Sequence, residues 1–187
     1  MTRLLLASAA VLALTGFAQA QTAVSVPAFK SIELEGGGHV TIKHGDAQRV
    51  TLLAGSTQYT KFHIEGRDKL VIEACKDDCP HNYDLRIEIV TPEFGGAAIE
   101  GGGHIESVGD FPNQHDVSAA IEGGGVIDLR SIDAAEASAA VEGGGHISVR
   151  VAHSLNAAVE GGGHIEYWGN PQVSSAINGG GSVSRGS

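Results

Sequence analysis

The sequence is poor in aromatic residues, in positive charge and in long apolar runs. Of 187 residues only 5% are aromatic, and 22 acidic residues outnumber 12 lysines and arginines, so the net charge is −10. Such an acidic chain is not expected to bind nucleic acid, because phosphate contacts need a basic surface. With five prolines it is no proline-rich linker, and with 42% hydrophobic residues it is expected to fold.

The single long apolar run lies at the N-terminus. Residues 4–14 are largely apolar and follow Arg3, and Ala18-Gln19-Ala20 fits a small-x-small cleavage site. We therefore expect residues 1–20 to be a cleavable signal peptide and the mature chain to be exported, either to the periplasm or outside the cell. Eleven residues are too few to cross a bilayer, and no later segment has 18 apolar residues, so no membrane span is expected in the mature chain.

Glycine is abundant, and its placement is regular. Eighteen of the 27 glycines lie in six Gly-Gly-Gly triplets, at 36–38, 101–103, 123–125, 143–145, 161–163 and 179–181. Glutamate precedes five triplets, histidine follows four, and an aliphatic residue comes next in all six. The unit is therefore small-Ala-aliphatic-Glu-Gly-Gly-Gly-His-aliphatic, and the second half of the chain is a repeat.

The repeat length favours strands over helices. The residues before the last five triplets, from Glu100 to Asn178, lie 22, 20, 18 and 18 residues apart. A helical repeat needs about 33 residues or more, whereas 18–22 residues suit one coil of a β-solenoid. We predict one all-β domain over residues 21–187, with regular coils over residues 96–185. The predicted corners include Gly101, Gly102, Gly103, Gly143, Gly144, Gly145, Gly161, Gly162 and Gly163, because tight turns favour glycine.

Stacked coils would place equivalent side chains about 4.8 Å apart. Two inward aliphatic ladders are then expected, one of Ile99, Ile121, Val141, Val159 and Ile177, the other of Ile105, Ile127, Ile147 and Ile165. The first half also alternates apolar and polar residues, which predicts strands at 29–34, 39–43, 49–54, 62–65, 69–74 and 85–90. Residues 27–95 are interpreted as degenerate coils or as an antiparallel cap over the open end of the core.

Several of these motifs resemble a known family. An N-terminal Phe-x-x-Ile, the stacked Gly-x-Gly-x-Ile units, and Gly163-His164-Ile165-Glu166-Tyr167-Trp168-Gly169-Asn170-Pro171 are similar to the putative auto-transporter adhesin, head GIN domain family. The resemblance spans about residues 27–185. It implies a right-handed parallel β-helix in a secreted bacterial protein, with no established activity. Members of that family often carry Asp where this chain has His39, His104, His146 and His164.

The repeat brings acidic and imidazole side chains into two candidate binding ladders. They comprise Glu100, Glu122, Glu142 and Glu160, and His104, His146 and His164. Stacked carboxylates repel one another, and protonated histidine or a bound cation would offset that repulsion. His146 and His164 fall on adjacent coils and could share one Zn²⁺ or Cu²⁺, with Ca²⁺ a further candidate cation; a solvated polar ladder is the other interpretation. No other cofactor is expected.

Two smaller features carry alternatives. Cys75 and Cys79, the two cysteines of the chain, predict a disulfide in an exported protein, or a metal corner with His81. Tyr167 and Trp168 predict either an apolar C-terminal cap or a platform on which a sugar ring stacks.

The sequence contains no catalytic motif that we recognise. The repeat half has three arginines and no lysine to stabilise developing charge, and its acidic residues recur as a ladder rather than as a distinct pair. We therefore expect a non-catalytic, adhesion-like binding or structural module at the cell envelope, contacting a polymer, a protein or a second copy of itself. A cation-binding module and a polysaccharide-active β-helix enzyme are the alternatives.

Overall fold

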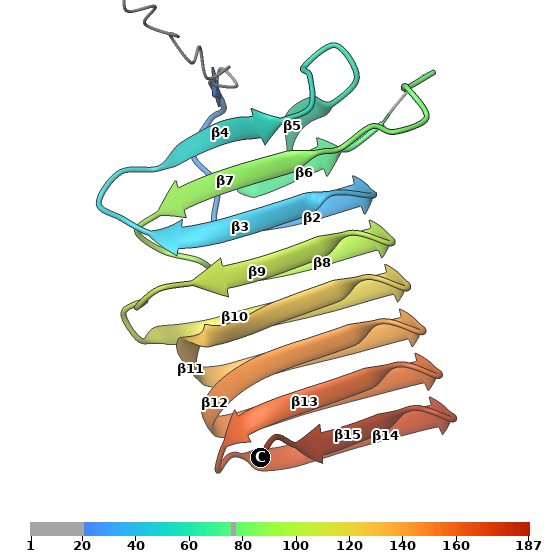
Figure 1. The fold of residues 1–187 in the computed structure, drawn as a ribbon. Helices are drawn as coiled ribbons and strands as arrows, with labels where there is room; N and C mark the ends of the chain where they lie inside the picture. The colour runs from blue at the N-terminus through green and yellow to red at the C-terminus, as the bar shows by residue number, and fades with distance from the viewer. Residues whose placement is uncertain (1–20, 76–77) are drawn as a thin grey trace, which may run out of the picture.

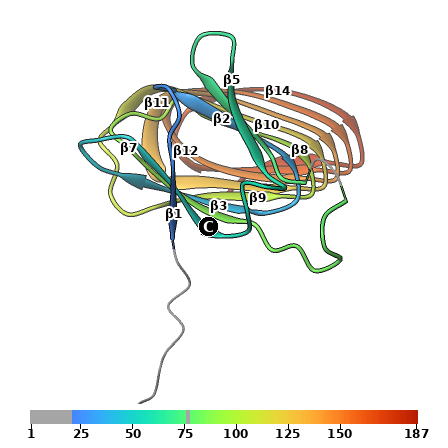
Figure 2. The same cartoon turned by 90° about the horizontal axis from the view of Figure 1, so that it is seen from above.

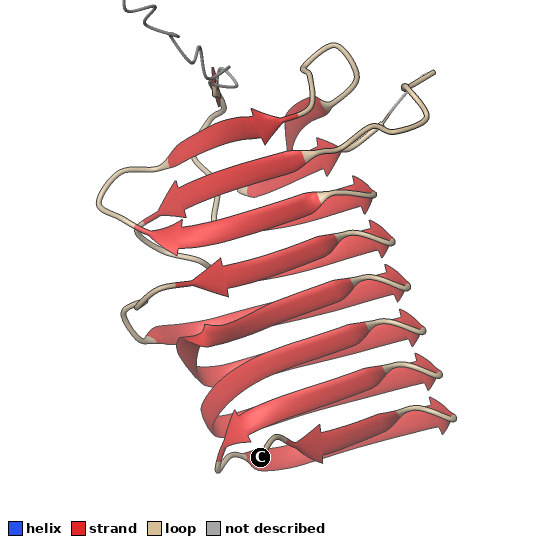
Figure 3. Ribbon diagram, viewed as in Figure 1, coloured by secondary structure: helices blue, strands red, loops and turns tan. Residues whose placement is uncertain are grey.

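The computed structural model describes residues 21–75 and 78–187, in which all the regular secondary structure is β-strand (Figure 3). The prediction of an all-β chain is confirmed. The predicted signal peptide, residues 1–20, lies outside the described residues. No helix long and apolar enough to cross a membrane occurs among the residues described.

The strands join in one curled sheet (Figure 1). The N-terminal strands are β1 (Thr22–Val24), β2 (Ser31–Gly36), β3 (His39–His44), β4 (Arg49–Ala54), β5 (Lys61–Glu65), β6 (Lys69–Glu73) and β7 (Arg86–Thr91). The remaining strands are β8 (Gly96–Gly101), β9 (His104–Val108), β10 (Gln114–Gly123), β11 (Val126–Gly143), β12 (His146–Gly161), β13 (His164–Gly169), β14 (Gln172–Gly179) and β15 (Ser182–Arg185). The six strands predicted in the first half all form, with bounds that differ by at most two residues.

Successive repeats pair in parallel and in register. Ile121 pairs with Ile99 and with Val141, and Val159 pairs with Val141 and with Ile177. These offsets are the repeat lengths read from the sequence. Each repeat therefore adds one more layer to the sheet, with like residue above like residue.

Each glycine triplet turns the chain from one side of the curled sheet to the other (Figure 2). We call the side formed by β2, β8, β10, the last parts of β11 and β12, and β14 the alanine side. The other side, formed by β3, β9, the first parts of β11 and β12, β13 and β15, is the histidine side. Aliphatic side chains from both sides meet between them, where Ile99 and Ile105 are at most 1% exposed.

The N-terminal region is arranged differently from a simple series of coils. Although Glu35 and Glu100 are far apart along the chain, these two residues pair directly, since β2 lies beside β8 and β3 beside β9. The chain between them includes β6 and β7. These two strands pair with the edges of β2 and β3 that face away from β8 and β9, and so add one more parallel layer. Both interpretations of residues 27–95 therefore describe part of it: a degenerate parallel layer, followed by antiparallel strands.

Antiparallel strands cover this end of the stack. β4 pairs antiparallel with β7, β1 with β4, and β5 with β6. The sheet as a whole is consequently mixed, and not parallel throughout as the repeat alone predicted. For β5 and β6 the change of direction has a local cause: the short turn around Gly66, which has a φ of +64°, reverses the chain into a hairpin.

The two ends of the sheet differ in how well they cover the core. At the N-terminal end Phe29 and Phe94 are at most 4% exposed. At the C-terminal end Ile177, the last member of its ladder, is 47% exposed and Val173 is 39% exposed. The other four members of that ladder are 1% exposed, so the last repeat alone leaves its apolar positions in contact with solvent.

The first glycine of each triplet has a positive φ, for example +118° at Gly143. A Cβ at Gly143 would also come within 2.5 Å of the carbonyl oxygen of Gly123, one layer away. Both observations exclude other residues here, because L-residues are strained at this φ and the layers cannot move apart without breaking their hydrogen bonds. Gly144, at the middle of the same triplet, has open space around it.

We predict that Gly143→Ala lowers the free energy of unfolding by at least about 2 kcal/mol, through backbone strain and the contact with Gly123. Gly144→Ala is the matched control and should change stability by no more than about 1 kcal/mol. Urea unfolding followed by circular dichroism measures both. Equal stability of the two variants would contradict this account of the turn.

Candidate functional site

The predicted glutamate ladder forms, on the alanine side beside the turns. Glu100, Glu122, Glu142 and Glu160 are exposed and stand in paired positions on successive strands. The structure extends the column through Glu35 to Glu73 at one end and closes it with Asn178 at the other. Sequence reasoning missed Glu73, because no triplet follows it.

Acidic groups crowd most closely where the repeats meet the N-terminal strands. Carboxylate oxygens of Glu33, Glu35 and Glu100 lie within 4.8 Å of one another. Glu33 is 8% exposed and forms an ion pair with Lys69, which also binds Glu65; the two carboxylates raise the pKa of Lys69 above its usual value. Lys69 thus supplies the positive charge that this cluster needs.

The hydrogen bond and the negative charge of Glu33, followed by partial burial, raise the pKa of the Glu100 carboxyl. Glu35 and Glu122 add to the shift in the same direction. When an acid has a higher pKa in the folded state than in the unfolded chain, its ionisation destabilises the folded state. Ionised Glu100 therefore lowers the free energy of unfolding at neutral pH.

The histidine side carries two pairs of histidines separated by Val126. His39 pairs in register with His104, and His146 with His164. The rings of His39 and His104 stack, with centroids 4.6 Å apart and an interplanar angle of 24°. The rings of His146 and His164 are farther apart, at 6.4 Å, and tilted by 59°. His39 follows the first triplet but was not placed in the predicted ladder, because it is too distant from His104 in the chain to share the repeat spacing.

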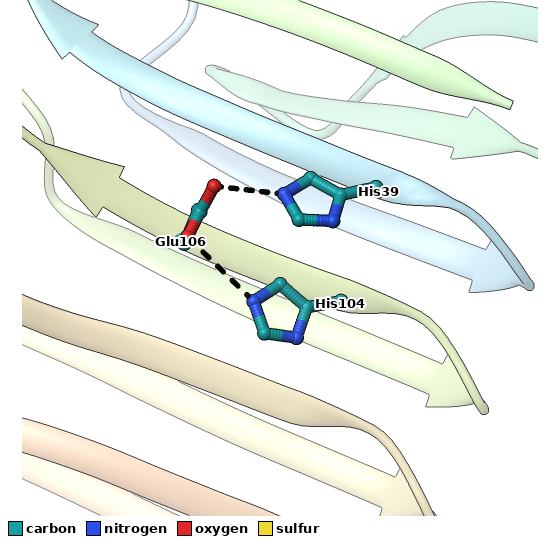
Figure 4. A group of neighbouring side chains, drawn as sticks. All are labelled: His39, His104 and Glu106. Atoms are coloured by element: carbon teal, nitrogen blue, oxygen red, sulfur yellow. Dashed lines mark hydrogen bonds and ion pairs between the residues drawn. The ribbon is translucent and has the colours of Figure 1, made fainter.

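Glu106 lies beside the first two histidines, with its carboxylate facing Nε2 of both rings (Figure 4). Its Oε1 is 2.9 Å from Nε2 of His39, and its Oε2 is 3.9 Å from Nε2 of His104. The hydroxyl of Thr41 donates to the same carboxylate at 3.3 Å. Glu106 was not predicted as a site residue, although it stands two residues after His104 and so on the same face of its strand. Burial, and then the nearby His39, lower the pKa of His104, which favours its neutral imidazole.

The predicted metal pair makes different contacts. Nδ1 of His164 is 2.9 Å from the hydroxyl oxygen of Ser182, and Nε2 of His146 is 3.2 Å from that of Ser148. The nearest carboxylate contact of His146 is with Glu166, at 3.9 Å. The two histidines are therefore neighbours, as predicted, but each contacts a serine hydroxyl.

Trp168 lies on the histidine side, with the guanidinium of Arg130 4.9 Å from its ring centre. The cation therefore covers a face on which a sugar would have to stack. Trp168 and Arg130 were not linked in the sequence, because they belong to different repeats and no shared motif connects them.

Cys75 and Cys79 form the predicted disulfide. A sulfur atom in a disulfide is not a thiolate ligand, so the alternative of a metal corner with His81 is not realised in this structure.

The alanine side is hollowed and almost uncharged at its centre. A shallow depression of about 430 Å³ runs across the strands. Its outward side chains are Ser118, Ala120, Ser138, Ala140, Asn156, Ala158, Ser174 and Ala176. Each of these small side chains lies beside another small one in the next layer.

The comparisons with known proteins bear on this architecture. One family profile, described as putative auto-transporter adhesin, head GIN domain, matches residues 28–115 and 112–171. The chain belongs to this family. The predicted resemblance to the head GIN domain family is thus confirmed. No curated protein matches the chain.

Several solved structures are similar to this GIN chain over most of its length. A putative adhesin from Bacteroides fragilis is 19% identical, with a TM-score of 0.45, and the match covers 89% of this chain and 96% of that one. A putative adhesin from Parabacteroides merdae is 15% identical, with a TM-score of 0.40 and coverage of 90% and 96%. A putative lipid binding protein from Parabacteroides distasonis is 17% identical, with a TM-score of 0.39 and the same coverage.

We predict that Glu100→Gln raises the melting temperature at pH 7. The gain in free energy of unfolding should be only about 0.5 kcal/mol, because solvent partly screens exposed charges. The amide can still donate to Glu33 but carries no charge. The gain should vanish as the pH falls below the ordinary glutamate pKa of 4.5, because wild-type Glu100 is then protonated. Glu160→Gln, whose outer neighbour is Asn178, should give a smaller gain at pH 7. Thermal unfolding between pH 3.5 and pH 7.5 tests both, and a gain that persists at low pH would contradict the electrostatic cause.

Proposed function

We propose that this chain is an exported, non-catalytic binding module of the cell envelope, which contacts a protein partner through the alanine side. We also propose that residues 96–185 form a right-handed parallel β-solenoid of 18–22-residue coils, which makes this side a rigid surface. Membership of a family described as an adhesin supports a binding role.

The observation that carries the proposal is the hollow on the alanine side. Its centre presents methyl groups, serine hydroxyls and one amide, and acidic residues stand at its two edges, Glu122 and Glu142 beside the turns and Asp116 and Glu136 at the other end. Small side chains allow another protein surface to approach closely, and a surface of this composition loses little solvation energy when it is covered. Enzymatic cleavage of a polymer would need convergent acidic and basic groups in a cleft, which this hollow does not contain among the described residues.

A protein partner fits the hollow better than a glycan does. Sugar rings are commonly held against aromatic faces, and the residues that line the hollow include none. The aromatic candidate Trp168 is partly buried, lies on the opposite side and has the guanidinium of Arg130 over its ring.

We predict that Ala140→Arg weakens binding to envelope preparations of the source organism by at least tenfold. Ala140 is exposed and lies between Ala120 and Ala158, so a long charged side chain there would fill the middle of the hollow. His164→Arg introduces the same side chain at an exposed position on the histidine side and should bind as the wild type does. Labelled residues 21–187 in a sedimentation assay give the readout.

Pre-treating the envelope with protease should abolish binding, whereas glycosidase treatment should not. Loss of binding only after glycosidase treatment would identify a glycan partner and reject the protein one. Wild-type binding by a folded Ala140→Arg variant would remove the alanine side from the interaction.

A further inference from the structure

We propose that His39, His104 and Glu106 form a binding site for a divalent transition metal of the zinc class. The three side chains come from two neighbouring strands of the histidine side and converge on one point (Figure 4). This site is independent of the hollow on the alanine side.

The geometry is close to that of a metal site. Both imidazoles turn Nε2 toward the same carboxylate, one at 2.9 Å and the other at 3.9 Å. One ligand atom from each of the three residues lies within 4.8 Å of the others. Around tetrahedral zinc, with bonds of about 2.0–2.1 Å, donor atoms are roughly 3.3 Å apart. Rotations of partly exposed side chains suffice to close the difference.

The donor atoms select the class of metal. Two imidazole nitrogens and one carboxylate oxygen suit Zn²⁺ and Cu²⁺, whereas Ca²⁺ and Mg²⁺ prefer sites made entirely of oxygen. The ion would replace the hydrogen bond between Nε2 of His39 and the Glu106 carboxylate. Thr41 holds the carboxylate by a hydrogen bond, in the way that neighbouring groups orient metal ligands.

Neighbouring charges on this side are already neutralised. Asp128, which pairs with Glu106 in the next layer, binds Arg130, with Oδ1 2.9 Å from Nε. Glu88, two layers away, binds Lys43 at 2.7 Å. Glu106 is therefore the carboxylate whose described partners are imidazoles and a hydroxyl, so its negative charge is available to a cation.

The repeat offers an internal comparison. His146 and His164 occupy the same place in the repeat, with Ser148 where the first pair has Thr41 and Glu166 where it has Glu106. Glu166 lies 3.9 Å from Nε2 of His146, but Nδ1 of His164 contacts the hydroxyl of Ser182, so the described contacts give these two histidines no shared carboxylate. Their rings are 6.4 Å apart, against 4.6 Å for the first pair. We assign the metal to the first pair because, among the described residues, it alone brings one ligand atom from each of two histidines and a carboxylate within 4.8 Å of one another. The bound ion would also tie β3 to β9, two strands that are distant along the chain.

The test is isothermal titration of tag-free, chelator-treated residues 21–187 with ZnCl₂. We expect saturable binding of one ion per chain, an increase in melting temperature with Zn²⁺, and no effect of CaCl₂. Glu106→Gln preserves shape and His104→Ala removes one imidazole, and each should weaken Zn²⁺ binding at least tenfold. Circular dichroism without metal checks that both variants fold.

The double variant His146→Ala/His164→Ala is the matched control and should bind Zn²⁺ as the wild type does. A Co²⁺-loaded wild-type chain should show the visible absorption of a tetrahedral site, and the Glu106→Gln chain should not. The proposal is overturned if the wild type takes up no Zn²⁺, if Glu106→Gln binds it equally well, or if only the His146/His164 variant loses it.

Discussion

The structure depends on one constraint: within the stacked strands most residues lie directly against their counterpart in the next layer, about 4.8 Å away. Apolar residues satisfy this constraint inside, where the aliphatic ladders pack like against like. Glycine satisfies it at the turns, because a Cβ at Gly143 would meet the carbonyl oxygen of Gly123. The same spacing that makes the core regular brings equal charges together on the surface.

The two sides of the sheet offset the repulsion between these equal charges in different ways. On the alanine side the glutamates stand at the edge, and Lys69 compensates the most crowded of them. On the histidine side a carboxylate stands two residues after the histidine in β9 and in β13, and in β9 Glu106 faces the Nε2 atoms of His39 and His104.

The ends of the stack follow from the same geometry. Antiparallel strands pair with the N-terminal parallel layer, so no further parallel strand can add to its edge. The last repeat replaces the charged residues of its columns by Asn178, Ser182 and Ser184, and its Ile177 is half exposed. The two ends of the stack therefore differ: antiparallel strands cover one, and the other leaves its last apolar residues partly exposed.

The sequence by itself determined the local and periodic features. These are the strands, the turns, the inward ladders and the pairing of successive repeats within residues 96–185. These follow from alternation and from fixed spacing, which act between residues close in the chain. Only the tertiary structure decided that Glu35 lies beside Glu100, that β4 runs antiparallel to β7, and that Glu106 contacts His39. Those contacts join segments that are remote in the chain, and no local period specifies which layer a distant strand will join, because that choice depends on how the whole end of the core is covered.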